Sequence, residues 1–335
     1  VTLPNTITSI GEGAFCACES LTGLTIPAGI TNIGKSAFGG SAITSITIPD
    51  GVTNIGKGAF SECTKLTGVT IPDSVIDIGS GAFQRCESLT SISIPDSVTS
   101  IGESAFQGCS KLIDVSLSDS ITEIKASAFS ACSQLTSIKI PNDVNCIGKS
   151  AFHSCKSLAD LSIPDGVINI EKEAFRACSN LTDITIPNTV TSIGEDAFNG
   201  CTRLKNITLS QSLTKIKYNS FLGCINLTKI VIPNSVEVIE TYAFRGCKKL
   251  SSAALPDSIS ALYSNSSNWD DNVLYINNCL IKNSHNTESV NIRSGTRLIA
   301  GGAFSGSSNL KSLTLPDSVK VIGSSAFSDC TGVTS

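Results

Sequence analysis

The sequence has no methionine, one tryptophan, four tyrosines and two histidines among its 335 residues. Charged residues make up only 16%, and the formal net charge is −4. Lysine and arginine are dispersed, which argues against a nucleic-acid-binding protein, because such a protein needs clustered cations to neutralise phosphates. No stretch approaches the about 18 consecutive apolar residues of a membrane-spanning helix. The chain does not begin with methionine, so we expect a mature or excised piece of a longer protein.

Phenylalanine and cysteine are the residues that the chain does have, and both follow an internal repeat of 23 residues. The pattern L/I-P-x-x-V/I-x-x-I-G-x-x-A-F-x-x-C-x-x-L-x-x-I-x recurs along most of the sequence. All 13 phenylalanines occupy one column of it: Phe15, Phe38, Phe60, Phe83, Phe106, Phe129, Phe152, Phe175, Phe198, Phe221, Phe244, Phe304 and Phe327. Of the 14 cysteines, eleven occupy a second column: Cys18, Cys63, Cys86, Cys109, Cys132, Cys155, Cys178, Cys201, Cys224, Cys247 and Cys330.

The spacing within one repeat predicts short extended segments separated by turns. Leu24 and Ile26 alternate, so both point to one face of a strand. Pro27 cannot donate to a strand ladder and therefore ends the strand, and Gly34 is expected to permit a tight bend. Phe38 then lies in a short turn or 3₁₀-like segment, as a large wedge between layers. One repeat cannot bury its own apolar side, so the units are predicted to stack into a solenoid.

These residues resemble the BspA-like leucine-rich repeats, the treponemal type with about 23 residues per unit. The segment IPDSVTSIGESAFQGCSKL at 94–112 is one clear copy of the motif. The resemblance implies a β-rich leucine-rich-repeat solenoid, a right-handed superhelix with short turn or 3₁₀ segments. Members of this family are mostly large surface or secreted proteins implicated in adhesion to host proteins, to other microbes and to cells.

The cysteine column has a structural and a chemical interpretation. One cysteine per repeat at a fixed phase is typical of a small buried apolar residue, so we expect reduced structural thiols. Neighbouring cysteines in a ladder are close enough for a disulfide, but parallel side chains miss the dihedral angle that the bond requires. Cys16, Cys146 and Cys279 lie outside the column, and no C-x-x-C pair occurs, so we expect no metal site.

Neither histidine lies in a pattern typical of catalysis. His153 occupies a variable position of the repeat, for which we expect solvent exposure, and His285 lies in an irregular segment. Neither has a serine, cysteine or carboxylate pattern that indicates a triad or a ligand set. No glycine-rich phosphate loop is present. We therefore expect no enzyme, no catalytic residue, no metal and no cofactor.

Two polar columns admit both a binding and a structural role. The first follows the proline and could form a cation-binding spine, or its side chains could bond to backbone N–H groups of the turn, which we favour. Its members are Asp50, Asp73, Asp96, Asp119, Asn142, Asp165, Asn188, Asn234, Asp257 and Asp317. The second lies on the outward face of the strands, where threonine and serine suit the surface of a sheet without inviting aggregation. It could also bind an ordered lattice such as ice or a glycan surface or, as we favour, a macromolecular partner. Its members are Thr25, Thr47, Thr70, Ser93, Ser116, Ser162, Thr185, Thr208 and Thr314.

The repeat is interrupted between Leu262 and Ile292. Two short apolar runs around Asn277 and Asn278 predict a β-hairpin there. We therefore expect repeats over 1–262, an irregular insertion over 263–291, and repeats again over 292–335, as one continuous solenoid.

The residues that the motif does not supply gather in and before this insertion. They are the only tryptophan and all four tyrosines: Trp269, Tyr263, Tyr275, Tyr242 and Tyr218. Tryptophan and tyrosine are enriched at the energetic centres of interfaces, so we predict a partner-binding region here. The alternative is that Trp269 and Tyr275 pack over the local irregularity.

The sequence and the resemblance together favour a non-enzymatic, extracellular or cell-surface protein that binds through an extended repeat surface. The expected partners are proteins or glycans of a host or a neighbouring cell, or copies of the chain itself, with no nucleic acid. The alternative is a structural repeat protein that assembles into a filament or an extracellular matrix. A third interpretation, a sensor ectodomain, would need a membrane segment outside this piece.

Overall fold

The structure is a computed structural model that describes most of the chain. The described residues form strands, turns and connecting segments, and none of them is helical. Accordingly, none of these residues forms a helix long and apolar enough to cross a membrane. The chain divides into two compact units, Val1–Thr182 and Asp183–Ser335. The described residues are 1–240, 242–247, 249–250, 252–254, 261–262, 269–270, 273–276, 279–283, 287–296, 298–299, 303–323 and 325–334.

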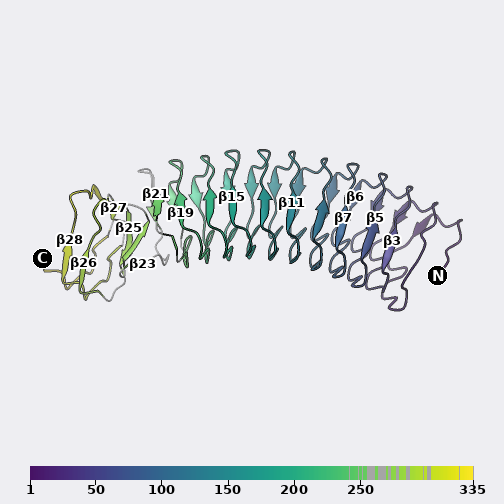
Figure 1. The fold of residues 1–335 in the computed structure, drawn as a ribbon, viewed down its shortest axis with the longest axis horizontal. Coiled ribbons are helices and arrows are strands. Elements are labelled where there is room, and N and C mark those ends of the chain that lie inside the picture. Colours follow the sequence, from purple (N-terminus) through teal and green to yellow (C-terminus); the bar gives the residue numbers. More distant parts are fainter. Residues whose placement is uncertain are drawn as a thin grey trace. The chain divides into compact units, whose positions relative to one another are not determined.

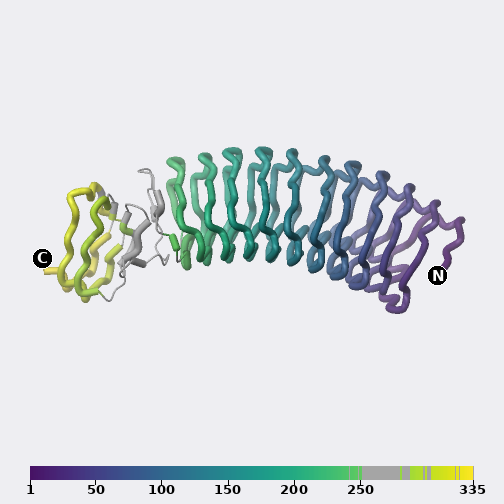
Figure 2. Tube along the Cα trace, in the orientation of Figure 1, coloured from purple at the N-terminus to yellow at the C-terminus, as the bar shows by residue number. Residues whose placement is uncertain are grey.

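The first unit is a β-solenoid in which successive repeats form successive coils (Figures 1 and 2). Most of these coils carry two short strands. The three-residue strands are β3 (Ser45–Thr47), β5 (Gly68–Thr70), β7 (Ser91–Ser93), β9 (Asp114–Ser116), β11 (Ser137–Lys139) and β13 (Asp160–Ser162). The two-residue strands are β1 (Ser9–Ile10), β2 (Asn32–Ile33), β4 (Asn54–Ile55), β6 (Asp77–Ile78), β8 (Ser100–Ile101), β10 (Glu123–Ile124), β12 (Cys146–Ile147) and β14 (Asn169–Ile170). Strands of successive coils pair in parallel with equivalent residues opposite one another, as Ile46 opposite Val69 and Ile33 opposite Ile55.

The second unit repeats the same arrangement. Its three-residue strands are β15 (Asp183–Thr185), β17 (Asn206–Thr208), β19 (Lys229–Val231), β21 (Ser252–Ala254), β26 (Ser289–Asn291) and β28 (Ser312–Thr314). Its two-residue strands with the same role are β16 (Ser192–Ile193), β18 (Lys215–Ile216), β20 (Val238–Ile239), β22 (Ala261–Leu262), β27 (Leu298–Ile299) and β29 (Val321–Ile322). Parallel pairing joins β15, β17, β19 and β21, and likewise β18, β20 and β22. The predicted solenoid class is therefore confirmed.

Three further strands of the second unit lie in the segment where the repeat is interrupted. They are β23 (Trp269–Asp270), β24 (Val273–Ile276) and β25 (Cys279–Asn283). β23 and β25 both pair antiparallel with β24, and β25 also pairs in parallel with β27. Residues 277–278, where the hairpin turn was expected, lie outside the described residues, and the predicted boundaries at 262 and 292 stay a prediction.

The side of the coil that carries phenylalanine is built from turns whose N–H groups alternate between two kinds of acceptor. In the repeat around Phe38, the Ala37 N–H donates to the Gly34 carbonyl (3.2 Å), three residues earlier. The next N–H, that of Phe38, donates to the Ala59 carbonyl of the following coil (2.7 Å). Ser36 has a left-handed backbone with φ of 50°, which allows this alternation. Of the two predicted conformations, turn or 3₁₀-like segment, the structure shows turns on this side. Their hydrogen bonds to the following coil connect the coils as the hydrogen bonds between paired strands do.

Gly34 serves a different purpose from the bend that the sequence suggested. Its φ is not in the left-handed region that favours glycine. A Cβ atom on Gly34 would lie 2.6 Å from the Gly11 carbonyl carbon and 2.7 Å from the Ile10 carbonyl oxygen of the preceding coil. The glycine therefore permits close approach of two backbones, and the expectation of a tight bend is wrong.

The core of each unit is a column of stacked phenylalanine rings between aliphatic layers. In the first unit, from Phe15 to Phe175, neighbouring rings lie 5.2–5.7 Å apart with interplanar angles of 1–8°. In the second unit, Phe221 lies 5.6 Å from Phe198 and 5.4 Å from Phe244. These distances fall in the range of offset stacking. Equivalent phenylalanine rings of successive coils therefore stack on one another in the described interior of both units.

Candidate partner-binding site

Two of the five predicted aromatic residues meet in the structure. Tyr218 and Tyr242 come from adjacent repeats of the second unit, and their ring centroids lie 5.8 Å apart at 64°, an edge-to-face contact. Tyr218 is 39% exposed and Tyr242 is half-buried. The backbone N–H of Tyr218 donates to Glu240 Oε2 (2.9 Å), which fixes the position of this tyrosine against the next repeat.

The other three aromatic residues lie in the interrupted segment. Trp269 is in β23 opposite Leu274, and Tyr275 is in β24 opposite Leu280. Tyr263 lies outside the described residues. A common binding region for all five aromatic residues therefore stays a prediction.

Arg245 completes the tyrosine pair and was not singled out in the sequence. Its guanidinium carbon lies 4.9 Å from the ring centroid of Tyr242, which is cation–π distance. The backbone N–H of Arg245 donates to the Tyr242 carbonyl (3.0 Å), and this bond closes the turn that brings the two side chains together. Tyr242 occupies the left-handed position of this turn with φ of 61°. The repeat alignment shows that Tyr242 precedes Arg245 by three residues, but only the turn geometry shows that the two side chains meet.

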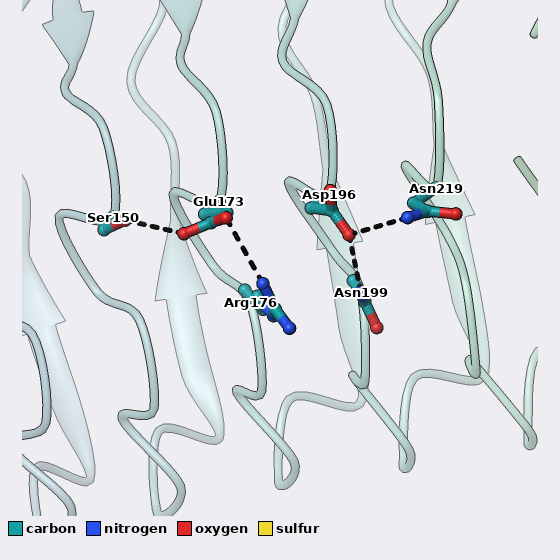
Figure 3. A network of polar contacts seen from close by, with 6 residues as sticks. All are labelled: Ser150, Glu173, Arg176, Asp196, Asn199 and Asn219. Atoms are coloured by element: carbon teal, nitrogen blue, oxygen red, sulfur yellow. Dashed lines mark hydrogen bonds and ion pairs between the residues drawn. The ribbon is translucent and has the colours of Figure 1, made fainter.

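The same two positions of the turn carry a charged pair in the first unit. Glu173 is in the left-handed position with φ of 60°, and Arg176 follows three residues later. Arg176 Nη1 donates to Glu173 Oε1 (3.2 Å), and the buried Ser150 hydroxyl donates to Glu173 Oε2 (3.1 Å), as Figure 3 shows. Here the carboxylate neutralises the guanidinium.

The equivalent turn of the second unit carries an acid and amides. Asp196 is 7% exposed, and its Oδ1 accepts hydrogen bonds from Asn199 Nδ2 (2.6 Å) and Asn219 Nδ2 (3.1 Å), as Figure 3 also shows. Asn219 Oδ1 is buried without a hydrogen-bond partner among the described residues. These turn positions thus hold side chains that hydrogen-bond within and between coils, and the pair of Tyr242 and Arg245 departs from that pattern.

His153 lies in the same column as Arg176, one repeat earlier. The residue was expected to be exposed to solvent, and the structure shows it half-buried. Burial is the main cause that lowers the pKa of His153; nearby Arg176 lowers it further, and Glu173 opposes them. The side chain is therefore neutral at physiological pH.

The cysteine column is buried and has a hydrogen-bonding role that the sequence did not reveal. The Cys109 thiol donates to the Phe83 carbonyl (3.1 Å), and Cys132 donates to Phe106 in the same way (3.2 Å). Burial raises the pKa of Cys109 to about 12. Each cysteine whose side chain the structure describes is a free thiol, and Cys18 and Cys330 are the half-buried ones among the described members of the column.

Two members of the turn column of aspartate and asparagine follow the structural alternative. Asp96 Oδ1 accepts the backbone N–H of Asp119 (3.1 Å), and Asn188 Oδ1 accepts that of Gln211 (2.9 Å). Each bond connects a side chain to the turn of the next coil. Among the residues that the structure describes, no group of three or more histidine, cysteine, aspartate or glutamate side chains could hold a metal ion.

The outward face of the three-residue strands is polar and accessible. The central residue of most of these strands is buried, as Ile46 (4% exposed) is, while its neighbours Ser45 and Thr47 are exposed. All nine serine and threonine residues of the predicted outward column are exposed. A flat face of small polar side chains can contact a large partner without inviting aggregation.

Comparisons with known proteins agree with this architecture. A leucine-rich repeat protein from Bacteroides ovatus is 28% identical, with a TM-score of 0.75 over 99% of this chain and 85% of its own. A leucine rich cell surface protein from Faecalibacterium prausnitzii is 32% identical, with a TM-score of 0.54 over 79% of this chain and 88% of its own. A search of curated protein sequences returned no match. The family model described as BspA type leucine rich repeat region (6 copies) matches residues 1–112, 63–182, 168–268 and 260–335, so the chain belongs to the BspA type leucine-rich repeat family.

Proposed function

We propose that this chain is a non-enzymatic binding protein, displayed on the cell surface or secreted, that adheres to macromolecular partners. The observation that carries the proposal is its likeness to the Faecalibacterium prausnitzii cell surface protein, which extends over 79% of the chain at 32% identity. A parallel solenoid suits this role because it repeats the same exposed face in every coil.

The binding mechanism that fits the surface is many weak contacts with a few strong ones. Exposed serine and threonine side chains lose little conformational entropy on binding, and each contributes little affinity. Exposed tyrosine and arginine contribute more per residue, because they bring large contact area and directional donors. We expect partners among the proteins or glycans of a host or a neighbouring cell.

Surface display can be tested on intact cells that express the protein. We expect brief protease treatment of unbroken cells to remove the protein, or culture medium to contain it, while a cytosolic marker stays intact. Protection of the protein in unbroken cells, with none in the medium, would refute the proposed location.

Adhesion is tested with the purified chain on intact cells and on immobilised extracellular proteins. Saturable, dissociable binding is expected, and it should compete with unlabelled chain. Size-exclusion chromatography at several concentrations distinguishes the structural alternative, since growth in size with concentration would favour assembly of copies over adhesion as a monomer.

A further inference from the structure

We propose that Arg245, Tyr242 and Tyr218 form a subsite for a saccharide that carries a carboxylate, such as a uronic or sialic acid. The inference rests on the proposed binding function and names a ligand class for one place on the second unit. The inference starts from the exposed guanidinium of Arg245, which contacts a tyrosine ring. The equivalent arginine of the first unit, Arg176, instead contacts the carboxylate of Glu173.

The counterpart is Arg176, which occupies the same position of the turn in the first unit. There the residue three positions earlier is Glu173, and the guanidinium donates to it at 3.2 Å. In the second unit that position is Tyr242, so the guanidinium of Arg245 lies over a neutral ring at 4.9 Å. Within the described residues no ion pair involves Arg245, and its side chain is exposed. Its donors are therefore available to an anion from solution.

The stacking also prepares the guanidinium for a planar acid. An arginine has five N–H donors in a fixed fork that matches the two oxygens of a carboxylate. Contact with the Tyr242 ring restricts the orientations of this fork, and the edge-to-face contact with Tyr218 in turn supports Tyr242. A restricted side chain loses less conformational entropy when the ligand binds.

The surroundings favour a sugar acid over a polyanion or a protein segment. Glu240 accepts the backbone N–H of Tyr218 (2.9 Å), and Asp196 accepts the amide of Asn219, the residue after Tyr218 (3.1 Å), so two carboxylates lie near the tyrosine pair. These carboxylates repel ligands with dense negative charge. A protein partner needs roughly 800 Å² of contact around a desolvated centre, whereas this cluster is two rings and one guanidinium. The exposed ring of Tyr218 can instead pack against the C–H face of one sugar.

The test uses the full chain on immobilised oligosaccharides in three sets. One set ends in glucuronic or sialic acid, the second contains the same sugars with the carboxylate reduced to an alcohol, and the third is sulfated but lacks a carboxylate. We expect retention on the first set and an affinity lower by about tenfold or more on the other two.

Variants identify the residues responsible. Arg245→Ala and Tyr242→Asn should each lower affinity for the carboxylated set by about tenfold or more, and Arg245→Lys should not restore it, because lysine has no fork. Asparagine tolerates the left-handed backbone at 242, and circular dichroism checks that each variant folds. The matched control is Arg176→Ala, whose arginine is already neutralised and which should leave binding unchanged.

The proposal is overturned if no oligosaccharide is retained, if the reduced or sulfated sets bind equally well, or if Arg176→Ala weakens binding as much as Arg245→Ala. Retention of acidic peptides with the same dependence on Arg245, in place of sugars, would also overturn it and indicate a protein ligand. If the chain adheres to cells while Arg245→Ala has no effect, only the subsite is refuted, and the proposed function stands.

Discussion

The phenylalanine column allows a quantitative test of what holds the coils together. Phe129 is fully buried, and its ring lies 5.4 Å from Phe106 and 5.7 Å from Phe152. Phe129→Ala removes the ring and leaves a cavity between two others. Comparable truncations cost about 3–5 kcal/mol. We expect the free energy of unfolding to fall by that amount, measured by urea titration with circular dichroism.

Two further variants separate stacking from simple burial. Phe129→Leu keeps most of the volume and should cost less than about 1.5 kcal/mol. Phe15→Ala removes a half-buried ring that stacks on Phe38, so its cost should be clearly smaller than that of Phe129→Ala. The coils interact mainly with their neighbours, so hydrogen exchange in Phe129→Ala should increase most in the coils around residue 129. A loss below about 1 kcal/mol for Phe129→Ala, or an equal loss for Phe15→Ala, would refute the reasoning.

Three other expectations follow from single positions. At pH 8, an alkylating reagent should label exposed Cys16 in the native protein, but Cys109 only after denaturation. Mass spectrometry of peptides measures the labelling at each cysteine. Labelling of Cys109 in the native protein would contradict its burial and its pKa of about 12. Gly108→Ala should destabilise by about 1–2 kcal/mol, because φ is +76° and the new Cβ would lie 3.2 Å from Arg85 Cγ. The control Gly68→Ala, with open space around it, should change the melting temperature little, and equal effects would refute the strain. Burial lowers the pKa of His153 in the folded protein, so unfolding takes up a proton when the pH is below about 6.5. The free energy of unfolding should therefore fall as the pH is lowered below about 6.5, and it should fall less steeply in His153→Gln. Identical pH profiles of the two proteins would contradict this role of His153.

The candidate site was only partly visible in the sequence. Tyr218 and Tyr242 stand out because the motif supplies no tyrosine, and the structure brings them together. Arg245 does not stand out, since arginine also occurs at the equivalent position 176. Arg245 differs from Arg176 in the side chain that it contacts, which is the ring of Tyr242 in place of the carboxylate of Glu173. Only the geometry of the turn shows that these side chains are in contact.

The repeat in the sequence by itself determined the class of fold, because a motif whose apolar positions recur every 23 residues can bury them only by stacking equivalent units. It also identified which columns are inside, since phenylalanine and cysteine each keep one phase. The tertiary structure alone decided how neighbouring coils are connected. Gly34 serves close approach to the backbone of the preceding coil, and each thiol of the type of Cys109 bonds to a carbonyl 26 residues earlier. These interactions join residues of different coils, so they depend on the distance between backbones, which a one-dimensional pattern does not contain.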